Sequence, residues 1–357
     1  MAAAGWIGVS MRPEMTRASG SDSATVAQKK RRDARRVRIA ELDYPTAWLA
    51  SGRPSRRIGY KRIVRLRLLE AINLATLGVL AILTLVLWNR LPEPGGLLGR
   101  YGLLACGVVV IALCVPRAER WPAPLRVVLD FYPAAFIPLL YETLGPLIAA
   151  ARGGARDDLL IAADRRLLGT DVTVWLQRLV TPLANDFFYL SYTTYYFIAL
   201  SLGVVLWFQD KPALRRYIFT LTFCYLVSYA GYFALPALGP RYALADRHTV
   251  SLETTPISRT ISETLNSLEH TKFDVFPSGH TMIAVTVLLV AFRRARRAFW
   301  WLLPVACCLI ASTVYCRYHY VVDVIAGAVL AAAAVPAGDW IYDRLRAPGA
   351  AAVPSDA

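Results

Sequence analysis

Two histidines and one aspartate in the C-terminal third of the chain have types and spacing that suit nucleophilic and acid–base chemistry. His280 follows the sequence Pro-Ser-Gly at the start of a long apolar run, and His319 precedes Asp323 by four residues. Residues four apart share one face of a helix, so the carboxylate can hold one tautomer of the imidazole and stabilise its cation. A histidine held in this way can act as a nucleophile or a base. An ionisable pair at the edge of an apolar segment predicts a functional site.

The turn in front of His280 predicts an anion site. Pro277 and Gly279 favour a sharp entry into a helix, and Ser278 can cap that helix. The first backbone N–H groups of a helix have no partner within it and attract anions. A histidine at this position can hydrogen-bond a bound phosphate and donate a proton.

The remaining histidines and the cysteines carry a weaker signal. His248 and His270 lie in polar sequence, and we interpret both as solvated loop residues. The six cysteines lie in or beside apolar runs with no zinc-like spacing, and Asp274 stands alone rather than in a carboxylate cluster that would hold magnesium. We therefore expect no metal and no cofactor.

The composition predicts that these residues sit on membrane helices. The chain has 357 residues, of which 56% are hydrophobic and 18% charged, and its mean hydropathy is +0.41. Apolar runs of roughly 18 residues are candidate bilayer spans, and we count about eight. The predicted fold is an all-α polytopic membrane helical bundle. The expected spans lie near 68–88, 97–115, 124–143, 187–208, 215–236, 280–292, 299–316 and 320–338.

The distribution of Lys and Arg predicts the orientation of the chain. Basic residues concentrate before the first span and in alternate short loops, which are therefore expected on the cytoplasmic side. This orientation predicts a multi-pass plasma membrane protein with His280 and His319 on the non-cytoplasmic face. The net charge of +15 lies mainly in the N-terminal tail and these loops. We therefore do not expect nucleic-acid binding. The basic tail can instead contact anionic lipid headgroups.

Two further segments leave alternatives open. Residues 157–180 alternate charged and apolar residues at helical spacing, which fits either an amphipathic helix on the outer membrane face or a plain connector helix. The aromatic run over 187–197 fits either a belt at the headgroup level or the lining of a lipid headgroup pocket.

The motifs together resemble the type 2 phosphatidic acid phosphatase superfamily, which has a six-helix core. Residues 277–280 match its Pro-Ser-Gly-His motif completely. Its third motif matches at Ser312, His319 and Asp323, with Gly327 as the usual trailing glycine. The resemblance covers roughly the last six spans.

The departures from the family pattern indicate a branch. Thr313 stands where the third motif has arginine, and Arg317 can supply that charge. The first motif is reduced to Gly-Pro-Arg-Tyr around Arg241, with Ala234 where its lysine should be. A weakened first motif of this kind looks like the inositol phosphorylceramide synthase branch, which moves a phosphoinositol headgroup between lipids.

The resemblance implies a mechanism. It makes His319 the nucleophile that forms a phosphohistidine, with Asp323 orienting it, and His280 the proton donor to the leaving oxygen. The acceptor is water or a lipid alcohol, and the substrate is a membrane lipid with a phosphoester headgroup. The resemblance also implies a set of phosphate-binding residues, namely Arg241, Ser278, Gly279 and Arg317.

Two alternatives to headgroup transfer remain at this point. One is a phosphatase that hydrolyses phosphatidic acid or a prenyl diphosphate, and the other is a transporter that binds lipid phosphate without cleaving it. No oligomeric state is predicted. The expected organisation is a disordered basic cytoplasmic tail (1–60), two additional membrane helices (61–120), the six-helix core (121–340) and a flexible C-terminal tail (341–357).

Overall fold

A computed structural model describes residues 67–268 and 271–346. The chain divides into two units, and every described residue belongs to the second, 63–357. The ordered elements of these residues are all helices, which confirms the predicted all-α membrane bundle. The predicted basic tail 1–60, His270 and residues 347–357 lie outside the described residues.

Six described helical segments are long and apolar enough to cross a membrane. A seventh span results if α9 (Pro182–Thr193) and α10 (Tyr195–Gln209), which are bent by 47° at their junction, are counted as one. The short span predicted near 280–292 is α14 (Gly279–Arg294), with 16 residues. The six are α2 (Leu68–Val86), α3 (Pro94–Cys114), α4 and α5 together (Ala123–Tyr141), α11 (Lys211–Ala234), α15 (Arg296–Tyr315) and Val321–Leu345 of α16 (Val321–Arg346).

Shorter helices connect these segments. The break inside the third span falls at Tyr132, between α4 (Ala123–Phe131) and α5 (Pro133–Tyr141). The connecting helices are η1 (Trp88–Arg90), η2 (Val115–Arg120), α6 (Leu144–Arg152), α7 (Asp157–Leu168), α8 (Val172–Trp175), η3 (Leu176–Leu179), α12 (Pro240–Ala243), η4 (Ala245–Arg247) and α13 (Pro256–Leu268).

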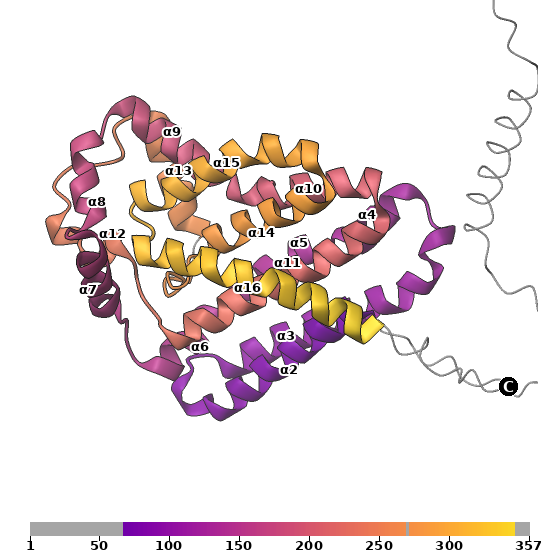
Figure 1. Cartoon of the computed structure of the whole chain (residues 1–357). Coiled ribbons are helices and arrows are strands. Elements are labelled where there is room, and N and C mark those ends of the chain that lie inside the picture. Colours follow the sequence, from indigo (N-terminus) through magenta and orange to yellow (C-terminus); the bar gives the residue numbers. More distant parts are fainter. Residues whose placement is uncertain (1–66, 269–270, 347–357) are drawn as a thin grey trace, which may run out of the picture. The chain divides into compact units, whose positions relative to one another are not determined.

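Helix α14 lies at the centre of the packing and contacts α10, α11, α15 and α16 (Figure 1). Its side chains at Met282, Ile283 and Val287 are fully buried. Packing between membrane helices depends on close van der Waals contact and on small residues. Gly327 shows this, because a Cβ there would lie 2.5 Å from the Ser278 carbonyl oxygen. Glycine lets α16 touch the turn that begins α14.

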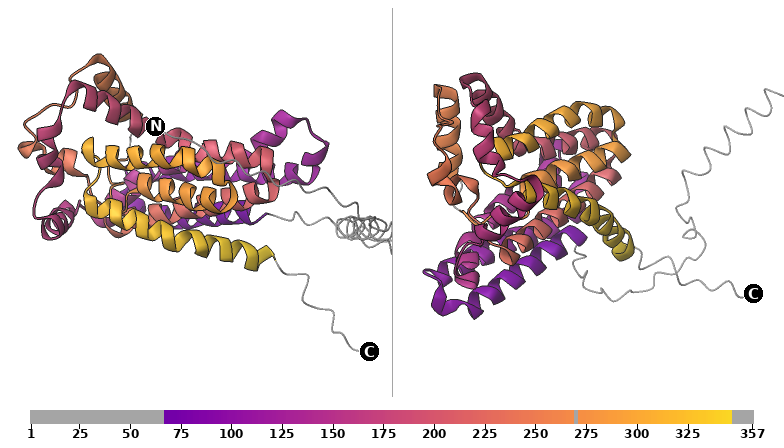
Figure 2. Two further views of the ribbon diagram at one scale, coloured as in Figure 1. Left: turned by 45° about the horizontal axis from the view of Figure 1, so that its top comes forward. Right: turned by 60° about the vertical axis from the view of Figure 1, so that its left-hand side comes forward.

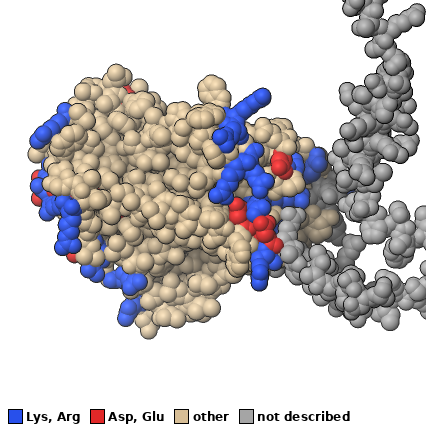
Figure 3. Space-filling model, in the orientation of Figure 1, with Lys and Arg blue, Asp and Glu red and all other residues tan. Residues whose placement is uncertain are grey.

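Charged side chains gather at the two ends of the described helices. In Figure 3 the Lys and Arg side chains lie toward both ends of the face drawn, and a broad band without charge lies between them. The connecting helices α7, α8 and α12 lie together at one end, and the views in Figures 1 and 2 agree on this. An uncharged band between two charged ends is what a membrane-spanning bundle requires.

The segment over 157–180 differs from the single helix that we predicted. Helix α7 ends at Leu168, because Gly169 adopts φ 74° and its N–H donates to the Arg165 carbonyl. A left-handed glycine at this position is a common helix stop. The chain continues into α8 and η3, so the prediction of one helix over 157–180 is confirmed up to Leu168 and is wrong beyond it.

Candidate active site

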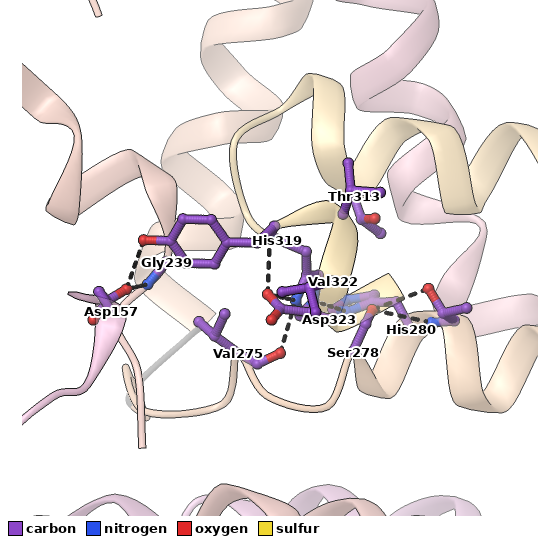
Figure 4. A network of polar contacts seen from close by, with 12 residues as sticks. Asp157, Gly239, Val275, Ser278, His280, Thr313, His319, Val322 and Asp323 are labelled. Carbon is purple, nitrogen blue, oxygen red and sulfur yellow. Dashed lines mark hydrogen bonds and ion pairs between the residues drawn. The ribbon is translucent and has the colours of Figure 1, made fainter. Parts of the chain in front are cut away.

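The structure brings His280 and His319 together from segments 39 residues apart (Figure 4). His280 lies in the first turn of α14, and its Nδ1 is 3.2 Å from the Nε2 of His319. His319 lies in the loop between α15 and α16, so the expectation that it shares a helix face with Asp323 is wrong. The two side chains still lie close, because Asp323 is in the first turn of α16.

The second ring nitrogen of His319 faces a backbone carbonyl. Its Nδ1 lies 3.0 Å from the Val275 oxygen and 3.6 Å from Asp323 Oδ2, which itself accepts the Tyr320 N–H at 2.9 Å. A carbonyl can only accept, so the hydrogen of His319 is assigned to Nδ1. The Nε2 lone pair is then directed toward His280. The role of Val275 could not be predicted from the sequence, because any residue type can supply a backbone carbonyl.

Burial keeps the His319 ring neutral. The residue is 3% exposed, and its removal from water lowers its pKa to about 4. Asp274 and the Val275 carbonyl oppose this shift, whereas the positive charge of Arg241 adds to it. Neutral imidazole is the form that can attack phosphorus.

The turn before His280 is built as the sequence predicts. Ser278 caps α14, and its hydroxyl accepts the Thr281 N–H at 3.3 Å. The Ser278 N–H donates to the Asp323 carbonyl at 3.1 Å, which ties this turn to α16. The Ser278 side chain is fully buried, and its hydroxyl oxygen accepts hydrogen bonds from both the N–H and the hydroxyl of Thr281. Gly279 packs against the hydroxyl of Tyr232.

The two arginines expected to bind phosphate have different surroundings. The guanidinium of Arg241 lies over the ring of Tyr318, 4.4 Å from its centre, and acts electrostatically on His319. Arg317 turns away, and its Nη2 donates to the Val250 carbonyl at 2.6 Å. The structure therefore places Arg241 over Tyr318, next to the ring of Tyr192 that packs on His280, and directs Arg317 toward Val250.

Aromatic rings form one wall of the histidine pair. The rings of Tyr192 and Tyr195 pack against His280 with centroids 4.6 and 4.2 Å away. Tyr192 also stacks on Tyr318 at 4.4 Å. Of the two interpretations of the aromatic run 187–197, these contacts favour a pocket lining over a belt alone.

A cavity of about 360 Å³ opens beside His280. We call it the tyrosine cavity. His280 and Asp274 line it, and Asp274 accepts the Tyr141 hydroxyl at 2.5 Å. The cavity extends between α5, α10 and α11, and apolar and tyrosine side chains form most of the rest of its wall, together with Glu142 and Thr222. Its tyrosines are Tyr141, Tyr195, Tyr196, Tyr217, Tyr225, Tyr229 and Tyr232.

A second cavity of about 360 Å³ lies on the other side of Tyr318. We call it the polar chamber. Loop residues and α13 supply most of its wall, and Tyr318, which lines it, stacks on Tyr192, which packs against His280. Its polar lining residues are Arg241, Ser251, Glu253, Ser262, Asn266 and Arg317.

The remaining predicted positions lie outside this constellation. His248 is half-buried rather than solvated, because η4 brings it to α8, where its Nε2 lies 3.2 Å from Thr173 Oγ1. The hydroxyls of Ser312 and Thr313 bond to carbonyls of their own helix, and the Thr313 carbonyl accepts the His319 N–H. Thr313 thus supports the His319 loop through its backbone.

Comparison with known proteins gives one match. The family model described as the PAP2 superfamily matches residues 158–337, about half of the chain. The matched segment contains His280, His319 and Asp323. No curated protein and no solved structure matches the chain.

Proposed function

This chain belongs to the PAP2 superfamily, and we propose that it is a multi-pass membrane enzyme that transfers the phosphoryl group of a lipid phosphoester through His319. One observation carries the proposal. His280 Nδ1 lies 3.2 Å from His319 Nε2, His280 lines the tyrosine cavity, and Tyr318, the neighbour of His319 in the chain, lines the polar chamber. A lipid phosphoester has its phosphorus at the boundary between hydrocarbon and polar headgroup.

His319 is the nucleophile in this mechanism. Its Nδ1–H is directed to the Val275 carbonyl, so Nε2 carries the lone pair that attacks phosphorus. A bond forms between Nε2 and phosphorus, and the bond from phosphorus to the lipid alcohol oxygen breaks. The product of this step is a phosphohistidine and a lipid alkoxide that needs a proton.

His280 supplies that proton, in its protonated form, from the position facing Nε2. It then accepts a proton from the incoming hydroxyl, which attacks phosphorus and restores His319. Arg241 balances the charge that develops on the phosphoryl oxygens. Asp323, 3.6 Å from Nδ1 of His319, favours the imidazolium that forms when the ring binds phosphorus.

The finer proposal is headgroup transfer, most like phosphoinositol transfer, rather than hydrolysis. The polar chamber supports it, because Glu253, Ser262 and Asn266 offer hydrogen-bond donors and acceptors suited to a hydroxylated headgroup. Two arginines and one glutamate give its lining a net positive charge. The Arg241 guanidinium also covers the rings of Tyr242 and Tyr318, which removes the open aromatic faces that a quaternary ammonium headgroup prefers.

The tyrosine cavity supports a role in holding the hydrocarbon part of the substrate or of the acceptor. It reaches from His280 to exposed residues such as Tyr196 and Leu200 on α10. A volume of about 360 Å³ falls in the range of small-molecule sites. The acceptor in the proposed reaction is a lipid alcohol whose hydroxyl reaches the phosphohistidine from this side.

The proposed location is the plasma membrane, with the site on the non-cytoplasmic face. The support is the distribution of Lys and Arg along the sequence. Cysteine labelling of Thr249→Cys, beside the polar chamber, with a membrane-impermeant reagent on intact cells tests the face. Labelling only after the membrane is opened contradicts it.

Incubation with defined lipids tests the activity. Purified protein in detergent is given phosphatidylinositol, phosphatidic acid or a prenyl diphosphate, each with and without ceramide or diacylglycerol. Headgroup transfer yields a new inositol lipid only when the acceptor is present, whereas hydrolysis yields free phosphate or inositol phosphate without it. If no substrate loses its phosphorus group, the enzymatic proposal is wrong, and vesicle transport of the same lipids then tests the transporter alternative.

A further inference from the structure

Two carboxylates of α7 are buried against the loops that form the histidine site. Asp157 and Asp164 are seven residues apart, about two helical turns, and therefore lie on one face of α7. They are only 7% and 3% exposed. A buried carboxylate is costly unless hydrogen bonds compensate it, so their partners matter.

Asp157 joins two separate loops (Figure 4). Its Oδ1 accepts the Gly239 N–H at 2.8 Å, and its Oδ2 accepts the Leu238 N–H at 2.9 Å. Oδ1 also accepts the Tyr320 hydroxyl at 2.9 Å. One carboxylate thus holds the turn that leads to Arg241 and the residue that follows His319.

Asp164 holds the start of α16. Its two oxygens accept the N–H groups of Val321 at 3.0 Å and Val322 at 2.8 Å. The first amides of a helix have no partner within it, so α7 satisfies them from outside. Together with Asp323, which accepts the Tyr320 N–H, carboxylates fix three consecutive amides directly behind His319.

The two loops also touch each other. The Arg241 N–H donates to the Arg317 carbonyl at 2.9 Å. Gly239 adopts φ 88°, and a Cβ at this position would lie 2.7 Å from the Tyr318 oxygen. A small displacement of either loop therefore changes the placement of Arg241 against the His319 ring.

We propose that Asp157 and Asp164 are positioning residues that hold Arg241 and His319 at the spacing that phosphoryl transfer requires. This inference rests on the proposed function. Neither carboxylate lines the tyrosine cavity or the polar chamber, so both act through the loops and not on the substrate. A misplacement of about 1 Å at a reacting centre can cost about a hundredfold in rate.

The competing explanation is that the two carboxylates only stabilise the fold. Asp171 offers a matched comparison, because it is also 7% exposed and lies in the same group of short helices. Its carboxylate pairs with Arg165 and Arg247 and makes no hydrogen bond to the loops of His319 or of Gly239. Loss of Asp171 therefore weakens the same region without touching the proposed alignment.

Kinetics of three single variants separate the two explanations. In Asp157→Asn and Asp164→Asn the side-chain size is kept, but the amide nitrogen cannot accept an N–H bond. We expect kcat to fall about 10- to 100-fold with KM changed by less than about threefold. Asp171→Asn should lower the melting temperature in detergent and keep the kcat of the folded protein. Equal loss of melting temperature in all three variants with kcat unchanged overturns the inference.

A second readout does not need turnover. Nuclear magnetic resonance of protein labelled with ¹³C in histidine reports the titration of His319, which lies beside His280 and Asp323 and is acted on by the charges of Asp274 and Arg241. Looser loops admit water and displace Arg241, so the pKa of His319 should rise from about 4 toward 6.5 in Asp157→Asn and Asp164→Asn. It should stay unchanged in Asp171→Asn. An unaltered titration in the first two variants refutes the positioning role, whereas absence of turnover in the unaltered protein refutes the proposed function alone.

Discussion

The tyrosine cavity and the polar chamber have the same volume of about 360 Å³ and opposite linings. Spanning helices form most of the first, and loops with the short helix α13 form most of the second. His280 lines the first, and Tyr318, which lines the second, stacks on Tyr192, which packs against His280. The difference fits the proposed reaction, in which the hydrocarbon and the headgroup of the substrate lie in different cavities.

In the proposed reaction the two cavities also have different functions, namely headgroup recognition and binding of the hydrocarbon part. Recognition of the headgroup depends on charged and hydroxyl groups in the polar chamber, and access of hydrocarbon depends on the width of the tyrosine cavity. Chemistry depends on His319 together with one lining residue of each cavity, His280 of the first and Arg241 of the second. Variants on each side and at the boundary should therefore have different kinetic signatures.

The largest loss of turnover is expected for changes at His280 and His319. His319→Ala removes the nucleophile and His280→Ala removes the proton donor, so each should lower turnover by at least about a thousandfold. Phosphorus release or headgroup transfer in detergent measures this. His248→Ala is the matched control, because that half-buried histidine bonds to Thr173 away from the pair. Full activity in either of the first two variants contradicts the role assignment.

The next largest effect distinguishes the two arginines. Arg241→Gln removes the positive charge nearest to His319 and should lower kcat/KM about a hundredfold, as loss of one transition-state donor does elsewhere. Arg317→Gln removes a side chain that bonds to the Val250 carbonyl and should cost less than about tenfold. Steady-state kinetics of both variants with one substrate checks the order. A reversed order means that the phosphate lies nearer to Arg317 than to Arg241.

A change on the apolar side should depend on chain length. Ala134 lines the tyrosine cavity, and Ala135 next to it is exposed and does not line it. Ala134→Phe narrows the cavity and should lower kcat/KM for long-chain lipids about tenfold, with less than a twofold change for a short-chain analogue. Ala135→Phe should change neither. Equal loss for both chain lengths would show that the hydrocarbon does not enter here.

A change on the polar side should depend on the headgroup. Glu253, in the loop before α13, lines the polar chamber and accepts the Ser262 hydroxyl at 2.8 Å, whereas Glu263 on α13 does not line it. Glu253→Gln should raise KM for phosphatidylinositol about three- to fivefold, the loss of about one exposed hydrogen bond. Phosphatidic acid, which lacks the hydroxylated group, should be unaffected. Glu263→Gln is the control, and a similar change in KM for both lipids contradicts headgroup binding in the chamber.

Much of this arrangement could be predicted from the sequence, but not its two cavities. Length and hydropathy were sufficient for the helical bundle, and Ser278 was correctly identified as the cap of α14. The proximity of His280 to His319 followed from motif resemblance. The role of the Val275 carbonyl and the direction of the Arg317 side chain were not predictable, because backbone acceptors and loop conformations leave no pattern of residue types.

The same limit explains why the buried side of α7 could not be predicted. Its charged residues at helical spacing predicted an amphipathic or connector helix, but not that Asp157 and Asp164 face the protein. Spacing alone does not reveal which face of an amphipathic helix is buried when buried carboxylates bind backbone amides. A signal was present in retrospect, since both acids lie in register with the buried Leu160.

The last effect is on stability rather than on turnover: an acid dependence that reports whether water reaches the His319 ring. Burial lowers the pKa of His319 to about 4 in the folded protein, against an ordinary value near 6.5. Between these values the unfolded chain binds the proton and the folded chain does not, so stability should fall as the pH drops from 6.5 to 4, by at most about 3 kcal/mol for this residue. His319→Gln cannot take up this proton, so its melting temperature in detergent should decline less steeply over the same range. Parallel declines for the variant and the unaltered protein would mean that water reaches the ring, and the boundary between the two cavities would then be wet.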